Sequence, residues 1–323
     1  MFVCPICQRN ACVSLSGRYT DYLTQESFML DYCHACGCAK TQGVSHSTQY
    51  YGESYYNSPS GKFSPLLEKW FHSNHRRNAQ SFYKRFQPRS VLEIGCGRAY
   101  LLKELQQCGC KVSCLESAQA SPWILNNQDI QVVIEQHPWP FEAEQFQMVI
   151  FWHVFEHLPH PLESLKQATR VLEKDQILCL SVPNISSYQA RLNLATWFHL
   201  DVPRHLFHFS KKGLVELLER HHYEIIEVTS GDAIQNLYGW FQSLANLFTP
   251  HTPNVLYRFL QGGQPWQTSK KFPLLIQLVT SIFWVPLGLI GYFLEVLTKQ
   301  HGTITIYAKK KSVEKSYSES HLQ

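Results

Sequence analysis

The sequence predicts an α/β fold: a seven-stranded, mostly parallel sheet with a small N-terminal module before it and a helical insertion near the C-terminus. From Pro88 onward, short apolar runs alternate with amphipathic stretches, as expected for parallel strands covered by helices on both faces. Two Cys-x-x-Cys pairs precede this region, and a long apolar stretch separates the sixth run from the seventh. With 323 residues, 44% of them hydrophobic, the chain can bury one full core and carry an accessory module.

The individual elements follow from this alternation. We expect strands at 90–94, 111–115, 130–134, 147–152, 176–182, 223–228 and 303–308, and helices near 99–107, 161–172 and 211–221. A further helix is expected to begin at Ser64, because apolar residues recur there at helical spacing. The predicted divisions are a module at 1–45, a linker and lead-in helix at 46–87, the core at 88–231 with its last strand at 302–310, an insertion at 232–301 and a polar tail at 311–323.

The charge and the N-terminus exclude some classes of protein. The net charge is +4, from 29 basic and 25 acidic residues without a block of like charges, which argues against a nucleic-acid partner. The first ten residues lack the continuous apolar stretch of a secretory signal. We therefore expect a cytoplasmic protein whose 11 cysteines are reduced thiols.

The two Cys-x-x-Cys pairs predict a structural zinc site in a zinc-ribbon-like module, because four thiolates can surround one zinc ion. The metal ligands are Cys4, Cys7, Cys33 and Cys36. A segment this short cannot build its own hydrophobic core, so metal binding would stabilise it. Cys12 and Cys38 are spare, and Cys38 could replace Cys36. Redox-active or incidental cysteines are the alternatives.

A glycine-rich turn between the first strand and the following helix predicts a nucleoside site. Gly95 and Gly97 allow backbone N–H groups to approach a ligand closely. Glu116 ends the next strand, where a carboxylate can accept both hydroxyls of a ribose, and Glu93 precedes the turn, where it can meet a cationic amine. A dinucleotide would require a third glycine where Tyr100 stands. S-Adenosylmethionine (SAM) has a ribose and an ammonium group but no phosphate, so it fits this acidic turn better than NAD.

The segment EIGCGRAYL resembles the first motif, E/D-x-G-x-G-x-G, of class I SAM-dependent methyltransferases of the type 11 and 23 kind. The region 146–184 resembles the surroundings of their fourth and fifth strands. Together the matches cover roughly 88–230 and 302–310, and they imply a Rossmann-like fold. The chain departs from the pattern at Ala99, where a third glycine is usual, and at Gln147, where the fourth strand usually opens with Asp.

The resemblance also implies which residues bind the cofactor. They are Glu93, Gly95, Cys96, Gly97, Glu116, Ser117 and His153. By the same resemblance, the loop 137–139 is expected near the ribose and adenine, together with Ser117. The cysteine module resembles a zinc-binding module that precedes some sugar-modifying methyltransferases.

The segment HVFEH follows the fourth strand. His153, Glu156 and His157 match His-x-x-Glu-His, a zinc-peptidase signature, but that motif requires a long helix, whereas Pro159 and Pro161 follow here at once. In the methyltransferase interpretation, the segment is a loop at the carboxyl end of a strand, where open parallel sheets bind ligands. Glu156 and His157 are then expected to face the active site as catalytic residues. The alternative is structural: a turn cap and a backbone hydrogen bond.

A second histidine segment, DVPRHLFHF, resembles one that closes the site in a subset of these enzymes. Its His205 and His208 are further candidate catalytic residues, because a histidine near its ordinary pKa of about 6.5 can act as a general base. Methyl transfer itself needs mostly in-line positioning, so a base is useful only for an acidic O–H or C–H acceptor. Core packing is the alternative role for both residues.

Residues 272–298 form an apolar run with one charge, Glu295, and the run is long enough to suggest a transmembrane helix. A single crossing would separate the last strand from its sheet. Pro286, Gly288 and Gly291 are expected to divide the run into two arms that are each too short to span. Lysines flank both ends (Lys270, Lys271 and Lys299), as expected for a hairpin that makes peripheral contact with the inner face of a membrane. A helical cap on the core or a homodimer contact are the alternatives.

These features predict SAM-dependent methyl transfer to an oxygen of a glycan, glycolipid or prenyl-lipid intermediate, with carbon as the second choice. The aromatic stretch 234–260 suits a large amphiphilic acceptor. One alternative is C-methylation of a nucleotide-linked sugar. Another is a non-catalytic, zinc-containing scaffold with a SAM-like fold, because Ala99 and Gln147 depart from the motif. The expected cofactors are SAM and structural zinc.

Overall fold

The computed structural model describes residues 2–44, 50, 63–117, 124, 130–261 and 271–311. Its central feature is a seven-stranded sheet with the order β13-β14-β11-β10-β7-β8-β9. The strands are β7 (Ser90–Ile94), β8 (Lys111–Glu116), β9 (Gln131–Ile134), β10 (Phe146–Trp152), β11 (Leu172–Pro183), β13 (Tyr223–Thr229) and β14 (Thr303–Lys310). Neighbours run parallel except at β14, which is antiparallel to β11 and β13. The α/β class and the seven strands are confirmed.

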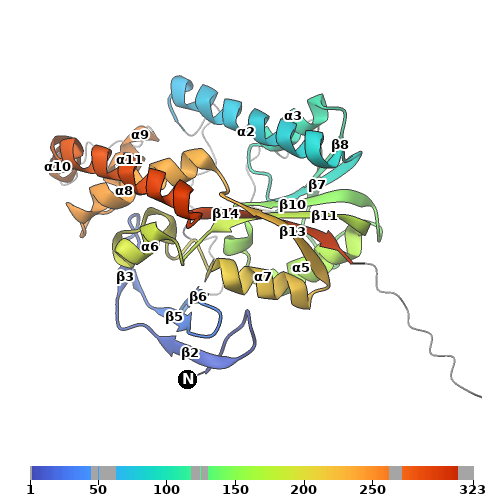
Figure 1. Ribbon diagram of the computed structural model, residues 1–323, viewed down its shortest axis with the longest axis horizontal. Helices are drawn as coiled ribbons and strands as arrows, with labels where there is room; N and C mark the ends of the chain where they lie inside the picture. The colour runs from blue at the N-terminus through green and yellow to red at the C-terminus, as the bar shows by residue number, and fades with distance from the viewer. Residues whose placement is uncertain are drawn as a thin grey trace, which may run out of the picture.

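Helices cover both faces of the sheet (Figure 1). On one face lie α2 (Pro65–Phe86) and α3 (Tyr100–Gln107), and on the other α5 (Pro161–Val171) and α7 (Lys211–Arg220). Met148 and Ile150 of β10 pack with the α2–α3 layer. Val149 and Phe151 point the opposite way and pack with α5 and α7. Because both faces are buried, the central strands read as continuous apolar runs in the sequence.

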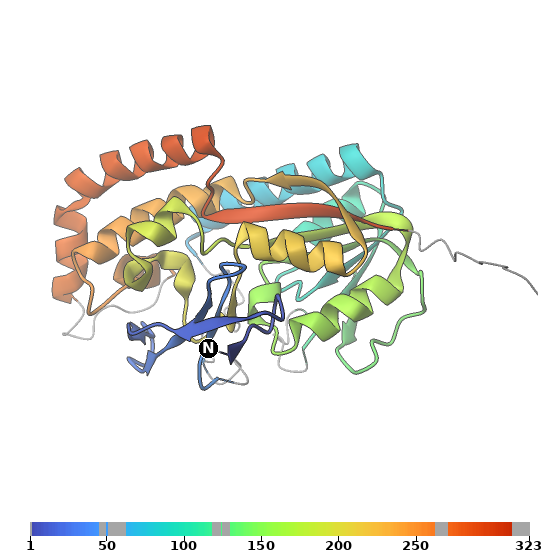
Figure 2. The ribbon, with the colours of Figure 1, turned by 60° about the horizontal axis from the view of Figure 1, so that its bottom comes forward.

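The insertion between β13 and β14 is helical. Its described helices are α8 (Ala233–Leu247), α9 (Val255–Leu260), α10 (Lys271–Val279) and α11 (Ser281–Thr298). α10 and α11 meet at an angle at Thr280, and α11 lies along α8 (Figure 2). We call α10 and α11 together the apolar hairpin, after the predicted hairpin, although the two helices are not antiparallel.

The apolar hairpin differs from the prediction in where it bends. The bend lies at Thr280, and Pro286, Gly288 and Gly291 all lie inside α11. The glycines allow close packing: a Cβ at Gly288 or Gly291 would lie 2.5 Å or 2.7 Å from an aromatic ring of α8. The two arms are therefore unequal, and α11 alone, with 18 residues, is long and apolar enough to cross a membrane by composition. However, α11 packs on α8 and leads directly into β14 of the central sheet.

The N-terminal residues form a small sheet that is built into the main domain. Its strands are β1 (Phe2–Val3), β2 (Asn10–Ser14), β5 (Leu30–Cys33), β6 (Ala39–Thr41) and β12 (Phe207–His208), with a hairpin of β3 (Tyr19–Thr20) and β4 (Ser27–Phe28) beside it. β12 comes from the main domain and pairs with β6. Ser210, the N-cap of α7, donates to the carbonyl of Cys36, and a Cβ at Gly213 would overlap the Cys38 thiol. The predicted linker and tail lie almost wholly outside the described residues.

Candidate active site

The glycine turn forms the cofactor side of the site. Gly95 (φ +66°) and Gly97 (φ +55°) adopt the left-handed conformation that favours glycine. A Cβ on Gly95 would lie 2.5 Å from Val154, so this glycine lets the turn pack against the loop after β10. A Cβ on Gly97 would meet nothing within 4 Å, which leaves space for a ligand. Ala99 also has a positive φ, of 55°, which explains why glycine is usual at this position.

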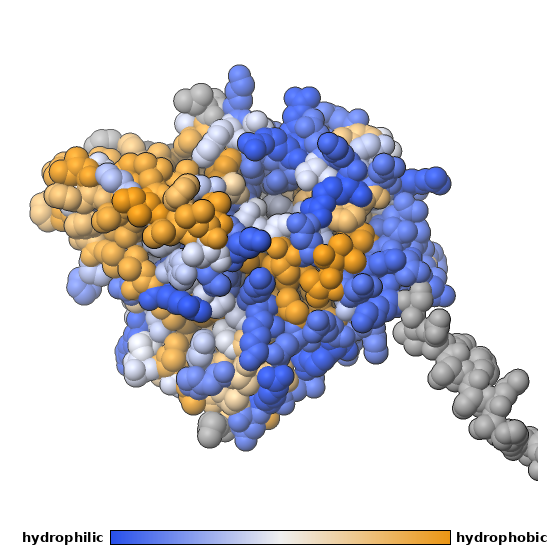
Figure 3. All heavy atoms as spheres, viewed as in Figure 1, coloured by the Kyte–Doolittle hydropathy of each residue, from blue (hydrophilic) through white to orange (hydrophobic). Residues whose placement is uncertain are grey.

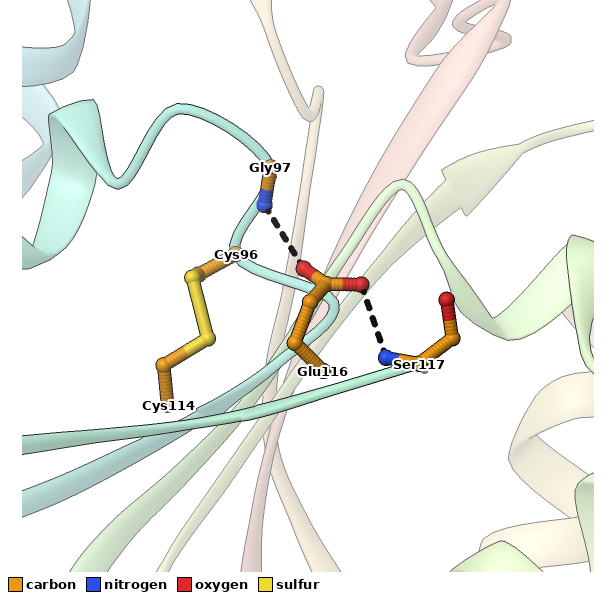
Figure 4. The surroundings of a disulfide bond; sticks show 5 residues. All are labelled: Cys96, Gly97, Cys114, Glu116 and Ser117. Atoms are coloured by element: carbon orange, nitrogen blue, oxygen red, sulfur yellow. Dashed lines mark hydrogen bonds between the residues drawn. A yellow bond between two sulfur atoms is a disulfide. The ribbon is translucent and has the colours of Figure 1, made fainter. Parts of the chain in front are cut away.

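Two glutamates, Glu93 and Glu116, flank the turn, and Figure 4 shows Glu116. Glu116 accepts hydrogen bonds of 3.1 Å from the backbone N–H groups of Gly97 and Ser117, which fix its carboxylate at the end of β8. Burial raises its pKa. Glu93 is buried, its Oε2 has no hydrogen-bond partner among the described residues, and burial and the charge of Glu116 raise its pKa well above the ordinary range. A ribose diol and an ammonium group would supply the missing donors, so these residues fit SAM.

A disulfide lies within this site. It joins Cys96, between the two glycines, to Cys114 on β8 (Figure 4). The expectation that all cysteines are reduced is therefore wrong at these two positions. The two side chains come together because β7 and β8 are parallel neighbours that pair Glu93 with Cys114. The disulfide ties the turn to the next strand, so Cys96 contributes to the site through backbone and cross-link, without a free thiol.

A pocket of about 370 Å³ lies at the carboxyl ends of β10 and β11. Its apolar wall is formed by Tyr22, Phe63, Leu67, Trp70, Phe71, Pro183, Phe198, Ile234, Tyr238, Tyr257 and Leu260. Its polar lining is His153, Glu156, His157, His199, Asp201, His205, Gln235 and Asn254. The predicted aromatic cap is present in part: the ring centroid of Phe198 lies 5.1 Å from that of Tyr238 on α8 and 5.0 Å from that of Tyr257 on α9.

Glu156 lies at the centre of the polar end of the pocket. Its Oε1 is 3.7 Å from Nδ1 of His153 and 4.0 Å from Nε2 of His205. Burial alone would raise the pKa of Glu156, but its interaction with His153 and the electrostatic influence of the nearby imidazoles of His157 and His205 outweigh burial and lower that pKa. The HVFEH segment contains a short 3-10 helix at Phe155–His157, which excludes the long helix of the peptidase alternative.

The loop that carries His205 is held by the N-terminal sheet. The buried guanidinium of Arg204 lies 2.7 Å from both Asp21 and Asp201. Thr41 donates a 2.7 Å hydrogen bond to the carbonyl of His205. Burial, and next the neighbouring His157, lower the pKa of His205 well below its ordinary value.

His208 does not share this position. Its Nε2 lies 3.0 Å from Thr41 Oγ1, and it is absent from the described lining of the pocket. Burial lowers its pKa to about 3. The His208 ring therefore lies beside that of His205, with the centroids 6.3 Å apart, but outside the described lining of the pocket, because its contact with Thr41 holds it at the N-terminal sheet.

The structure also shows the local contacts of Trp139 and Gln147, which the sequence analysis singled out. Trp139 is buried in the core, with its ring centroid 6.5 Å from that of Phe151, and the expected place of the loop 137–139 near the ribose and adenine stays a prediction. Gln147, where Asp is usual, accepts a 2.9 Å hydrogen bond from the backbone N–H of Arg89. It thereby supplies the acceptor that Asp would offer there.

Tyr22 and Asp201 are among the pocket residues that sequence reasoning missed. Tyr22 reaches the pocket from the N-terminal sheet, and nothing in its local sequence indicates this. Asp201 stands four residues before His205, and its Oδ2 lies 4.0 Å from Nε2 of that histidine. This i,i+4 spacing within the DVPRHLFHF segment was the available signal.

The four cysteines of the two pairs meet in the N-terminal sheet, all buried, with their sulfur atoms within 4.8 Å of one another. The Sγ–Sγ distance is 3.7 Å for Cys4 and Cys36 and 3.6 Å for Cys7 and Cys33. Zinc–sulfur bonds of ~2.3 Å in a tetrahedron separate the sulfurs by ~3.8 Å. The residues therefore fit a single tetrahedral ion. Cys38 points away, with its Sγ 3.7 Å from Ser210 Oγ.

The fold and the acidic glycine turn define an α/β domain that binds a nucleoside-containing cofactor at the carboxyl ends of its strands. Residues 68–228 match the family model described as a methyltransferase domain. This match supports a class I methyltransferase domain in the chain, for which SAM is the expected cofactor. No curated protein sequence matches the chain.

Three solved structures are similar to this chain at low sequence identity. A SAM-dependent methyltransferase from Archaeoglobus fulgidus is 17% identical, with a TM-score of 0.47, and the match covers 76% of this chain and 98% of that one. A putative sarcosine dimethylglycine methyltransferase from Galdieria sulphuraria is 12% identical, with a TM-score of 0.48 and coverages of 82% and 98%. A possible histamine N-methyltransferase from Thermotoga maritima is 15% identical, with a TM-score of 0.44 and coverages of 76% and 95%.

Proposed function

We propose that this enzyme methylates an oxygen of an amphiphilic acceptor, a glycolipid or prenyl-linked intermediate, at a membrane surface. The pocket carries this proposal, because it has an aromatic wall at one end and a carboxylate–histidine cluster at the other. Such a cavity suits a molecule with an apolar body and a polar reacting group. Carbon is the second choice of atom.

The positions of the residues suggest which of them bind the cofactor and which bind the acceptor. When bound, SAM supplies a methyl group that its sulfonium charge already activates. Gly97 leaves space for the ligand, Glu116 offers its carboxylate to ribose hydroxyls, and Glu93 offers acceptors to an ammonium group. Glu156, whose lowered pKa keeps it ionised, and His205 hold the acceptor oxygen and can take its proton.

The surface of the apolar hairpin supports a lipid-bound acceptor. Its exposed large side chains are Phe272, Leu275, Leu278, Val279, Ile282, Phe283, Leu287, Leu289, Ile290, Phe293, Leu294, Val296 and Leu297. Figure 3 shows this apolar area on the side of the molecule where α10 and α11 lie. The one acid of the hairpin, Glu295, is buried, and Lys271 and Lys299 stand at its ends. An apolar face edged by lysines matches an anionic membrane surface.

The hairpin is also continuous with the pocket. α9 contributes Tyr257 and Leu260 to the pocket wall, and the N–H of Leu256 on the same helix donates a 3.0 Å hydrogen bond to Gln277 on α10. A lipid-bound acceptor could therefore pass from the membrane surface to the pocket along α9. The cytoplasmic leaflet is the proposed location.

The four-cysteine cluster is proposed to hold structural zinc. Its sulfur spacing fits tetrahedral coordination, the carbonyl of Cys36 accepts a hydrogen bond from Ser210, and Thr41 of the same N-terminal sheet donates one to the carbonyl of His205. Zinc would thus stabilise one wall of the acceptor pocket from outside the catalytic domain.

Membrane binding is tested by flotation of the full chain with vesicles of mixed anionic and zwitterionic phospholipid at low salt. Wild type should float, whereas Ile282→Asp/Phe283→Asp should not, because it places charges at the exposed apolar face. Leu192→Asp/Ile226→Asp, which changes exposed apolar residues outside the hairpin, is the matched control and should still float. Wild-type protein that stays at the bottom of the gradient contradicts the membrane location.

The acceptor is tested by incubating membrane and soluble extracts with the protein and methyl-labelled SAM, followed by mass spectrometry. Label in a lipid fraction that depends on Glu116 supports the proposal. Label confined to nucleotide-linked sugars favours the C-methylation alternative, and the absence of both SAM binding and label favours a scaffold.

A further inference from the structure

Three potential metal-ligating residues converge at the polar end of the pocket. One ligand atom from each of Glu156, His157 and His205 lies within 4.8 Å of the other two. Glu156 and His157 come from the loop after β10, and His205 comes from the loop before β12. Tertiary packing therefore brings the imidazole of His205 to a carboxylate and an imidazole that are already adjacent in the sequence.

The backbone orients both imidazole rings. Nδ1 of His157 lies 2.9 Å from the carbonyl of Arg204, and Nδ1 of His205 lies 2.8 Å from the carbonyl of His199. A carbonyl only accepts hydrogen bonds, so each Nδ1 carries the hydrogen in a neutral ring and the lone pair is on Nε2. Metal-binding histidines typically show this pattern, because the carbonyl fixes both the tautomer and the orientation of the ring.

The carboxylate supplies a second, independent observation. Glu156 is 2% exposed, and its Oε2 has no hydrogen-bond partner among the described residues. Its Oε1 lies 4.0 Å from His205 Nε2, which is longer than a hydrogen bond. A buried carboxylate oxygen without a donor is costly, and a cation between the three side chains would satisfy it.

We propose that Glu156, His157 and His205 bind one divalent first-row transition-metal ion. Two imidazoles and one carboxylate form a set that such ions accept with coordination positions left open. The open positions would face the pocket, where an oxygen of the acceptor can bind. The ion would lower the pKa of a bound hydroxyl and so favour its deprotonation. The binding of the acceptor oxygen to the ion rests on the proposed function, whereas the binding of the ion itself does not.

This site differs in chemistry from the cysteine cluster, which allows a selective test. Thiolates favour zinc, whereas imidazole and carboxylate ligands also accept Mn²⁺. The full chain, first given one equivalent of zinc, which the four thiolates bind more tightly than imidazole and carboxylate do, is titrated with Mn²⁺, and the free ion is measured by electron paramagnetic resonance. We expect about one Mn²⁺ per chain, and at least a tenfold loss of affinity in Glu156→Gln.

Glu116→Gln is the matched control, because Glu116 is a mostly buried carboxylate on the cofactor side and should not affect Mn²⁺ affinity. Calorimetry with SAM verifies that Glu156→Gln is folded, and His205→Gln is a second variant if it is not. Wild type that binds neither Mn²⁺ nor Co²⁺ saturably, or a Glu156→Gln variant with wild-type affinity, overturns the metal site. Mn²⁺ binding that depends on Glu156 supports the site even if no acceptor is methylated, so the two proposals can fail separately.

Discussion

The cofactor side and the acceptor side of this active site are built in opposite ways. The cofactor side comes from one stretch, 93–117, and its contacts are local, such as the bonds from Gly97 and Ser117 to Glu116. The acceptor side draws on the N-terminal sheet, α2, two loops and the helical insertion. A contiguous site depends on backbone conformation at a few positions, whereas an assembled site depends on the packing of distant elements. Substitutions on one side should therefore change the binding or stability of that side and leave the other side nearly unchanged.

The largest expected effect is on the cofactor side. Gly95→Val should abolish SAM binding measured by calorimetry, because its φ of +66° disfavours a branched side chain and the added atoms would overlap Val154. Gly109→Val is the control: it has φ +95° and open space around it, so it carries backbone strain without touching the site. Normal SAM affinity in Gly95→Val would contradict the assignment of the turn.

The acceptor side should respond to loss of the cysteine cluster. Cys4→Ser/Cys33→Ser should lose about one zinc ion per chain in elemental analysis and lower the unfolding midpoint, because metal binding and the docking of the loop before α7 are lost together. SAM affinity should change far less, since the cluster does not touch 93–117. Cys12→Ser, a buried cysteine outside the cluster, should retain zinc. Full zinc content in the double variant would place the metal elsewhere.

Glu116→Ala should weaken SAM binding by about 1.5–3 kcal/mol, through the loss of charge-assisted hydrogen bonds to the ribose. Mn²⁺ affinity at the other end of the site should be unchanged. Calorimetry of SAM and of its demethylated product measures the loss. Equal affinities in wild type and variant would remove Glu116 from the cofactor site.

The smallest expected effect is a pH dependence of stability in the helical insertion. Burial raises the pKa of Glu295 from 4.5 to about 7, although Gln189 and Trp240 donate hydrogen bonds to it. A carboxyl group with a raised pKa stabilises the fold fully below pH 4.5, and this contribution is lost as the pH rises through about 7. Glu295→Gln, which resembles the neutral form, should be more stable than wild type at pH 8 by roughly 1–2 kcal/mol and similar to it at pH 4.5. Thermal unfolding at both pH values measures the difference, and parallel curves for the two proteins would contradict it.

Local sequence was sufficient for the sheet and for the cofactor turn. Strands buried on both faces must be continuous apolar runs, and a turn that meets a ligand with its backbone needs glycine, so both leave a signal within a few residues. Glu93 and Glu116 could be recognised for the same reason, since each is fixed by its place at the end of a strand. Even the departure at Ala99 was visible, and the structure gives its meaning as a strained left-handed residue.

The acceptor pocket and the bend of the hairpin depended on tertiary structure. Gly288 and Gly291 read as helix breakers in the sequence, but the rings of α8 require them for close packing inside α11. His205 and His208 are equivalent in the sequence, and only the pairing of β12 with β6 turns one toward the N-terminal sheet while the other lines the pocket. Such choices depend on which distant surface each element meets, and the pattern within one segment carries no information about that surface.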